Sequence, residues 1–187
     1  MLRTIYIFLL VLFSSAYVFS QEKINWMSIQ EAIAERENSS SPKKFIITIY
    51  TDKCGWCRKM DKNTFSQEFL AKTINEKFYP VKFHADSKET VFFKGREFKS
   101  LKGLRAGYHE LVEYLLKDNI QYPSVVFLDE EYNILQTIAG FQYADDFEKM
   151  VEFYGDDHYK VMSWRRFIKK SCTSVPKNYA IPVGNNY

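Results

Sequence analysis

Apolar runs and evenly spaced apolar positions alternate along this chain. Residues 45–50 are β-branched and aromatic almost throughout, which is typical of a strand buried on both faces of a sheet. Residues 79–85 also have a strand pattern, and residues 124–128 and 134–138 show it on either side of a turn at 129–133. The pattern predicts two strands in the first half of the chain and an antiparallel pair in the second.

Apolar residues at helical spacing predict helices between and around these strands. A short helix within residues 21–41 should pack in front of the first strand. Residues 58–62 and 69–78 indicate a helix broken near Asn63, and Thr64 with Gln67 resembles a capping box that restarts it. The order strand, helix, strand then implies a right-handed parallel crossover. Further helices are predicted over residues 108–116, 145–154 and 161–168.

One folded domain accounts for most of the chain. Its 187 residues, 46% of them hydrophobic, are enough for a single packed core. Residues 90–99 predict a small inserted hairpin that turns at Gly95, with Gly103 and Gly107 closing a loop behind it. We therefore divide the chain into an N-terminal segment (1–20), a helical lead-in (21–43), an α/β domain (44–155, insertion at about 87–107) and a helical extension with a tail (156–187).

The first twenty residues have the pattern of a secretory signal peptide. Arg3 is their only charge, and an unbroken apolar run follows it, from Ile5 to Phe13. We expect cleavage before Gln21 and a mature chain without stable membrane insertion. The alternative is an uncleaved membrane anchor, although the run is shorter than the ~20 residues that a spanning helix needs.

Charge makes nucleic acid an unexpected partner. The chain has 26 basic and 23 acidic side chains, mixed throughout, and a net charge of +3. No sustained basic stripe with interleaved aromatic residues is present, which is the pattern that nucleic-acid binding favours.

Two cysteines carry the chemistry that the sequence suggests. Cys54 and Cys57 are separated by two residues and lie where a predicted strand enters a predicted helix. Unpaired amides and the dipole at a helix N-terminus stabilise a thiolate, and Lys53 and Arg58 add positive potential on both sides. Cys54 is therefore the candidate nucleophile and Cys57 the candidate resolving thiol of a thiol–disulfide exchange.

This arrangement, with Tyr122-Pro123 immediately before a later strand, resembles the thioredoxin superfamily over residues 44–154. The resemblance implies a thioredoxin-like three-layer α/β fold, in which helices flank a central mixed β-sheet. Pro123 matches the family's cis proline, which faces the disulfide, and Tyr122 matches the residue that pairs with substrate backbone. The Cys-Gly-Trp-Cys centre, the following Lys59-Met60-Asp61 and Thr64-Phe65, and the leader are similar to exported thioredoxin-related proteins of bacteria.

The resemblance implies a periplasmic thiol–disulfide oxidoreductase that uses a redox-active Cys54–Cys57 disulfide and no metal or other cofactor. Its expected partners are disulfide-containing or thiol-containing proteins and a membrane electron-transfer partner. By family analogy we expect it to reduce or isomerise protein disulfides. A disulfide-donating oxidase and a redox-inactive peptide-binding module on the same fold stay open as alternatives.

Three positions depart from the thioredoxin pattern. Lys53 stands where thioredoxin has a tryptophan, Trp56 replaces the proline between the cysteines, and Thr48 occupies the place of a buried acidic residue. Because residues at and beside the cysteines tune the reduction potential, we expect Lys53, Gly55, Trp56 and Arg58 to set it here. The missing acid leaves open which group accepts a proton during resolution.

Other uses of the cysteines have less support. A structural disulfide would close a very short loop and restrict little chain entropy. Zinc would need further ligands, and the chain has no second paired motif among Cys172, His84, His109 and His158. Cys172 lies in the polar tail beyond the predicted core, as an unpaired surface thiol or as part of a regulatory or intermolecular disulfide. The aromatic residues of the hairpin would be candidates for substrate selection only if the hairpin overhangs the cysteines.

Overall fold

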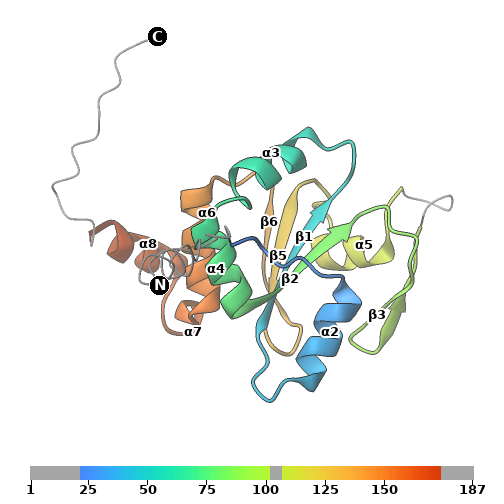
Figure 1. The fold of residues 1–187 in the computed structure, drawn as a ribbon, viewed down its shortest axis with the longest axis horizontal. Helices are drawn as coiled ribbons and strands as arrows, with labels where there is room; N and C mark the ends of the chain where they lie inside the picture. The colour runs from blue at the N-terminus through green and yellow to red at the C-terminus, as the bar shows by residue number, and fades with distance from the viewer. Residues whose placement is uncertain (1–21, 102–106, 174–187) are drawn as a thin grey trace, which may run out of the picture.

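A four-stranded mixed sheet lies at the centre of the molecule (Figure 1). In this computed structural model, which describes residues 22–101 and 107–173, the strands lie in the order β2-β1-β5-β6. They are β1 (Lys44–Tyr50), β2 (Phe78–His84), β5 (Ser124–Leu128) and β6 (Ile134–Ala139). Strands β1 and β2 are parallel, whereas β5 is antiparallel to both β1 and β6. The predicted strands, parallel crossover and antiparallel pair are confirmed.

Helices cover both faces of this sheet (Figure 1). They are α2 (Ile29–Asn38), α3 (Gly55–Asn63), α4 (Glu68–Lys77), α5 (Glu110–Leu116), α6 (Ala144–Gly155), α7 (His158–Val161) and α8 (Trp164–Thr173). The lead-in helix begins at a capping box, in which Ser28 and Glu31 exchange hydrogen bonds of 2.7 and 3.2 Å. No helix in residues 22–101 and 107–173 is long and apolar enough to cross a membrane.

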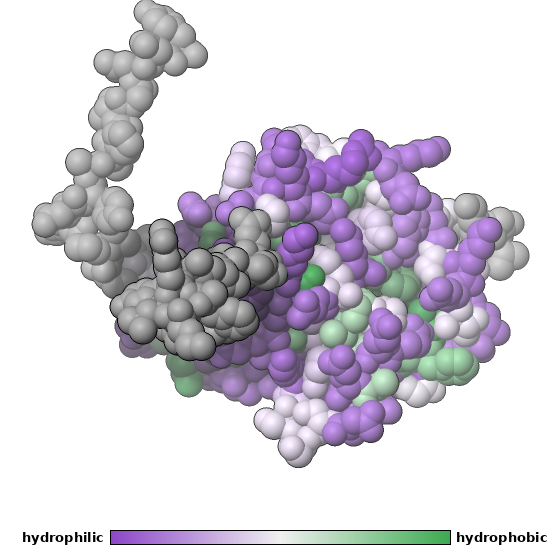
Figure 2. Space-filling view, viewed as in Figure 1, coloured by the Kyte–Doolittle hydropathy of each residue, from purple (hydrophilic) through white to green (hydrophobic). Residues whose placement is uncertain are grey.

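Alternate residues of β1 build two separate hydrophobic cores. Phe45, Ile47 and Ile49 belong to a cluster with α2, α5 and the inserted hairpin, whereas Ile46 belongs to a cluster with α3, α4 and α6. This division follows from the period of two along a strand, which sends neighbouring side chains to opposite faces. The face seen in Figure 2 is mainly hydrophilic outside its grey part, in keeping with these buried cores.

The inserted hairpin consists of β3 (Val91–Phe93) and β4 (Arg96–Phe98). The turn of the hairpin lies beside the β5–β6 turn, with Lys94 Nζ 3.1 Å from Asn133 Oδ1. Because β5 is antiparallel to β1, the β5–β6 turn lies at the opposite end of the sheet from the end of β1, after which the cysteines follow. Phe93 and Phe98 are buried in the first core, and only Phe92 is exposed among the three phenylalanines. The hairpin therefore does not overhang the cysteines. Gly103, expected in the loop behind it, lies outside the described residues.

Three local expectations need correction. Thr64 is not an N-cap: it ends α3, and its hydroxyl donates to Gln142 O at 2.6 Å, whereas Gln67 precedes α4 without a side-chain cap. The single helix expected over residues 161–168 is two helices, α7 and α8, because the backbone is extended at Met162. Cys172 lies in the last turn of α8 and not in a polar tail.

The expected leader lies outside the described residues, as do residues 174–187 of the tail. The signal peptide and the domain boundaries derived from it stay predictions.

Candidate active site

The two cysteines lie at the beginning of α3, where the chain leaves β1. Cys54 is the N-cap residue of this helix, and its N–H donates to Thr51 O at 3.2 Å to close the connecting turn. Cys54 and Cys57 form a disulfide. The N–H of Cys57 points at Cys54 Sγ, with a nitrogen-to-sulfur distance of 3.0 Å. The sulfur of Cys54 therefore occupies the capping position that a serine or aspartate oxygen fills in other helices.

The two sulfur-bearing residues differ in exposure. Cys57 is only 4% exposed, packed near Met60 on the inner side of α3, whereas Cys54 is partly exposed. A large disulfide substrate can approach Cys54 from solvent but has no comparable access to Cys57. A thiolate at Cys54 would also face the free amides and positive dipole end of α3.

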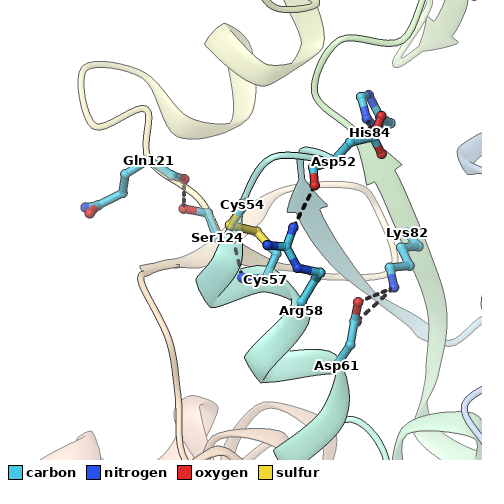
Figure 3. Close-up of a disulfide and its surroundings, with 9 residues drawn as sticks. All are labelled: Asp52, Cys54, Cys57, Arg58, Asp61, Lys82, His84, Gln121 and Ser124. Atoms are coloured by element: carbon cyan, nitrogen blue, oxygen red, sulfur yellow. Dashed lines mark hydrogen bonds and ion pairs between the residues drawn. A yellow bond between two sulfur atoms is a disulfide. The ribbon is translucent and has the colours of Figure 1, made fainter.

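The Tyr122–Pro123 peptide is cis and lies at the same end of the sheet as the cysteines. Strand register establishes this placement, because Ile49 near the end of β1 pairs with Ser124 at the start of β5. Ser124 Oγ donates to Gln121 O at 2.8 Å across the cis peptide (Figure 3). Burial raises the pKa of Tyr122 to about 12, with smaller contributions from the charges of Asp86 and Tyr108.

Charged side chains surround the beginning of α3. Lys53 and Arg58 are exposed, and the guanidinium of Arg58 donates to the backbone oxygen of Asp52 at 2.8 Å (Figure 3). His84 accepts from Asp86 N through Nδ1, which leaves its Nε2 facing the Asp52 carboxylate at 3.2 Å. The Arg58 hydrogen bond ties the first turn of α3 to the backbone of the turn that carries Cys54.

A second ion pair lies deeper along α3. Lys82 on β2 lies opposite Thr48 on the neighbouring strand β1. The ammonium of Lys82 contacts both carboxylate oxygens of Asp61, at 2.8 and 2.9 Å (Figure 3). Thr48 itself is buried, so no carboxylate is present at that strand position. The carboxylate that pairs with Lys82 comes instead from the helix that carries the cysteines.

An aromatic row beside the cysteines was not predicted from the sequence. The ring of Trp56 packs against Phe141 at 5.8 Å, and Phe141 packs against Tyr143 at 5.0 Å, measured between ring centroids. The ammonium of Lys59 lies over both Trp56 and Phe141, at 4.6 and 5.2 Å from their centroids. The spacing of Lys59 three residues after Trp56 on a helix was an available signal for one of these contacts.

Known structures share this architecture. A thioredoxin from Thermus thermophilus matches with a TM-score of 0.51 at 15% identity, over 70% of this chain and 85% of that chain. The chain has a thioredoxin-like fold. A Bacteroides thetaiotaomicron protein, described as a proposed disulphide isomerase, matches with a TM-score of 0.50 at 18% identity, over 72% and 94%. A thioredoxin-fold protein from Helicobacter pylori has a TM-score of 0.49 at 17% identity, over 77% and 93%.

Part of the chain matches a protein family. The family Thioredox_DsbH, described as a protein of unknown function (DUF255), matches residues 9–95, a range that contains both cysteines. No curated protein matches the chain. At these low identities the solved structures show the fold alone, and a shared fold does not establish a shared activity.

Proposed function

We propose that this protein is an extracytoplasmic thiol–disulfide oxidoreductase that acts on proteins through Cys54 and Cys57. One observation carries the proposal: the partly exposed Cys54 at a helix N-cap is disulfide-bonded to the buried Cys57 one turn inside the same helix. This asymmetry suits an exchange in which one cysteine meets the substrate and the other completes the reaction.

The exchange would proceed in two displacements when the protein acts as a reductant. The Cys54 thiolate attacks one sulfur of a substrate disulfide, forms a mixed disulfide and releases the other substrate sulfur as a thiolate. The Cys57 thiolate then attacks Cys54 Sγ and releases the second substrate thiolate. The substrate gains two electrons, the protein loses two by forming the Cys54–Cys57 disulfide, and solvent supplies protons to the thiolates released.

We propose that Tyr122 and Pro123 hold substrate backbone beside Cys54, and their position at the cysteine end of the sheet supports this role. We propose that Lys53, Gly55, Trp56 and Arg58 tune the potential, because all four lie at or beside the cysteines. The apolar leader supports export to the periplasm, where a membrane electron-transfer partner would restore the dithiol. No bound cofactor or metal is required in this scheme.

The test compares Cys57→Ser with Cys54→Ser. The Cys57→Ser variant should accumulate mixed disulfides with substrate proteins, visible as bands that disappear on reduction, because its attacking thiol has no resolving partner. The Cys54→Ser variant should accumulate few, because its remaining thiol is buried. Equal trapping by both variants would contradict these roles. If the variant that carries both Cys54→Ser and Cys57→Ser kept full activity, the thiols would be dispensable, and the peptide-binding module would be favoured instead.

The direction of electron flow is decided by the reduction potential of the pair. Equilibration with glutathione mixtures, followed by trapping of free thiols, measures it. A value near ~−270 mV supports the reductase that we propose, whereas a value near ~−120 mV supports a disulfide-donating oxidase.

A further inference from the structure

We propose that the aromatic row of Trp56, Phe141 and Tyr143, together with Lys59, selects substrates that carry an aromatic and an acidic residue close to the reacting cysteine. This inference rests on the proposed oxidoreductase function and names its substrate class. The occupant is an extended segment of a disulfide-containing protein, seated with its cysteine at Cys54 and its aromatic side chain on the row.

Exposure is the first reason to assign a binding role to these rings. Trp56 is 58% exposed and Tyr143 is 68% exposed, although both are large and their neighbour Phe141 is only partly exposed. Exposed aromatic surface is retained at a cost in hydration, and in protein interfaces such residues serve as anchors. Here the row begins at Trp56, between the partly exposed Cys54 and the buried Cys57.

The row is also held rigidly. Gly140 N–H donates to Pro123 O at 2.8 Å, which ties the segment carrying Phe141 and Tyr143 to the cis-proline loop. From the other side, Thr64 of the α3–α4 junction donates to Gln142 O at 2.6 Å. A surface that is fixed before binding loses little conformational entropy when a substrate side chain packs on it.

The geometry of the rings favours an aromatic occupant over an aliphatic one. Phe141 and Tyr143 meet edge to face with their ring planes 89° apart, and Trp56 is tilted by 49° against Phe141. A further ring can extend such a row in the same manner and gain a directional contribution beyond the area that it buries.

Lys59 supplies the preference for a carboxylate. It is exposed, and no acidic side chain lies in the first turn of α3. Its ammonium lies over the faces of Trp56 and Phe141, and no ion pair with it is found among residues 22–101 and 107–173. A carboxylate next to the substrate's aromatic residue would lie within reach of this ammonium and complement its charge.

The experiment uses the reduced protein and four short peptides, each joined through its single cysteine to glutathione. The residue before the cysteine is Phe or Ser and the residue after it is Glu or Lys, so the two preferences are measured separately. We expect the second-order rate constant for disulfide reduction to be about tenfold higher for Phe than for Ser, a ratio that partial burial of one ring can supply. We expect a few-fold preference for Glu over Lys, which should decrease as salt is added.

Variants test whether this surface causes the preference. Tyr143→Ser should bring the Phe-to-Ser rate ratio close to one, whereas Tyr143→Phe should retain it. Lys59→Gln should remove the Glu preference alone. Phe92→Ser is the matched control, because Phe92 is 65% exposed but lies on the hairpin, whose turn is at the opposite end of the sheet, and it should leave all ratios unchanged.

Failure of the substrate preference is distinguishable from failure of the proposed function. If the wild-type protein reduces glutathione disulfide and all four peptides at equal rates, the docking surface is wrong and the oxidoreductase function stands. If it reduces neither glutathione disulfide nor any peptide, the proposed function itself is wrong. An aromatic preference that survives Tyr143→Ser would also overturn the assignment.

Discussion

Tyr122 lies at the same end of the sheet as the two cysteines, and the pKa of its phenol is strongly raised. Burial is the main cause that raises the pKa of its phenol to about 12, with the charges of Asp86 and Tyr108 adding to it. In the unfolded chain the same phenol ionises near pH 10. Its contribution to stability is therefore complete below about pH 10 and is lost as pH rises toward about 12.

Replacing Tyr122 by Phe should make the alkaline loss of stability shallower. Urea unfolding of both proteins between about pH 9 and about pH 11 measures the slope, and the wild type should lose more free energy of unfolding over this interval. Parallel slopes would show that the phenol is solvated in the folded protein.

Residue types near the cysteines were predictable to different degrees. Cys54, Cys57 and Pro123 belong to motifs whose spacing is visible in the sequence, and the disulfide and the cis peptide are present in the structure. Phe141 and Tyr143 were missed because Phe141 meets Trp56, and Tyr143 meets Phe141, only through the fold, on a loop more than eighty positions from Trp56 in the chain. Sequence periodicity carries no information about such contacts.

At the scale of elements, Thr64 joins the α3–α4 junction to the loop after β6. The residue is fully buried, and its hydroxyl donates to Gln142 O at 2.6 Å. Thr64→Val keeps the shape of the side chain but leaves a carbonyl without its donor, so we expect a loss of about 1–2 kcal/mol in the free energy of unfolding. Urea denaturation measures this loss.

Thr73→Val provides the comparison for Thr64→Val. The Thr73 hydroxyl donates to Phe69 O within α4 at 3.1 Å, and that bond joins no separate elements. This change should stay within about 0.5 kcal/mol. Equal losses in the two variants would mean that the link between α3 and the loop contributes nothing specific.

Strands were predicted more accurately than helix boundaries, for a physical reason. The central strands β1 and β5 are buried almost throughout, so their apolar runs begin and end nearly where the strands do. Helix ends depend on which groups satisfy the terminal backbone, and Thr64 donates to a distant carbonyl instead of capping α4. Local sequence therefore gave the wrong role to a residue whose partner is supplied by tertiary structure.

At the scale of the whole molecule, one buried ammonium holds three distant segments together. Lys44 at the start of β1 is 5% exposed, and its Nζ lies 3.0 Å from Glu130 in the β5–β6 turn and 2.9 Å from Asp157 at the α6–α7 junction. Burial alone would lower the pKa of Lys44, but hydrogen bonds to Asp157 and Glu130 raise it overall. The C-terminal helices are thus attached to the sheet by charge as well as by packing.

Asp157 makes this attachment sensitive to acid. Burial acts to raise its pKa, but hydrogen bonds from Lys44 and Lys160 outweigh burial and hold the pKa below the ordinary value of 3.8. Because the folded-state pKa is lowered, the contribution to stability is present above about pH 4 and is lost as pH falls through the folded-state value. The left-handed backbone at Asp157 (φ 59°) suits Asn as well as Asp, so Asp157→Asn isolates the charge.

Asp157→Asn should lower the free energy of unfolding by about 1 kcal/mol at neutral pH. This value is well below that for breaking a fully buried pair, because the Asp157 side chain is 44% exposed and solvent screens it. Urea unfolding at about pH 7 and about pH 3 should show the difference in unfolding free energy from wild type shrinking in acid.

The control variant is Asp118→Asn, because Asp118 is exposed and has no ion pair among residues 22–101 and 107–173. It is expected to match wild type at both pH values. If Asp157→Asn also matches wild type at neutral pH, Glu130 alone compensates Lys44, and the α6–α7 junction is held to the sheet by its apolar contacts.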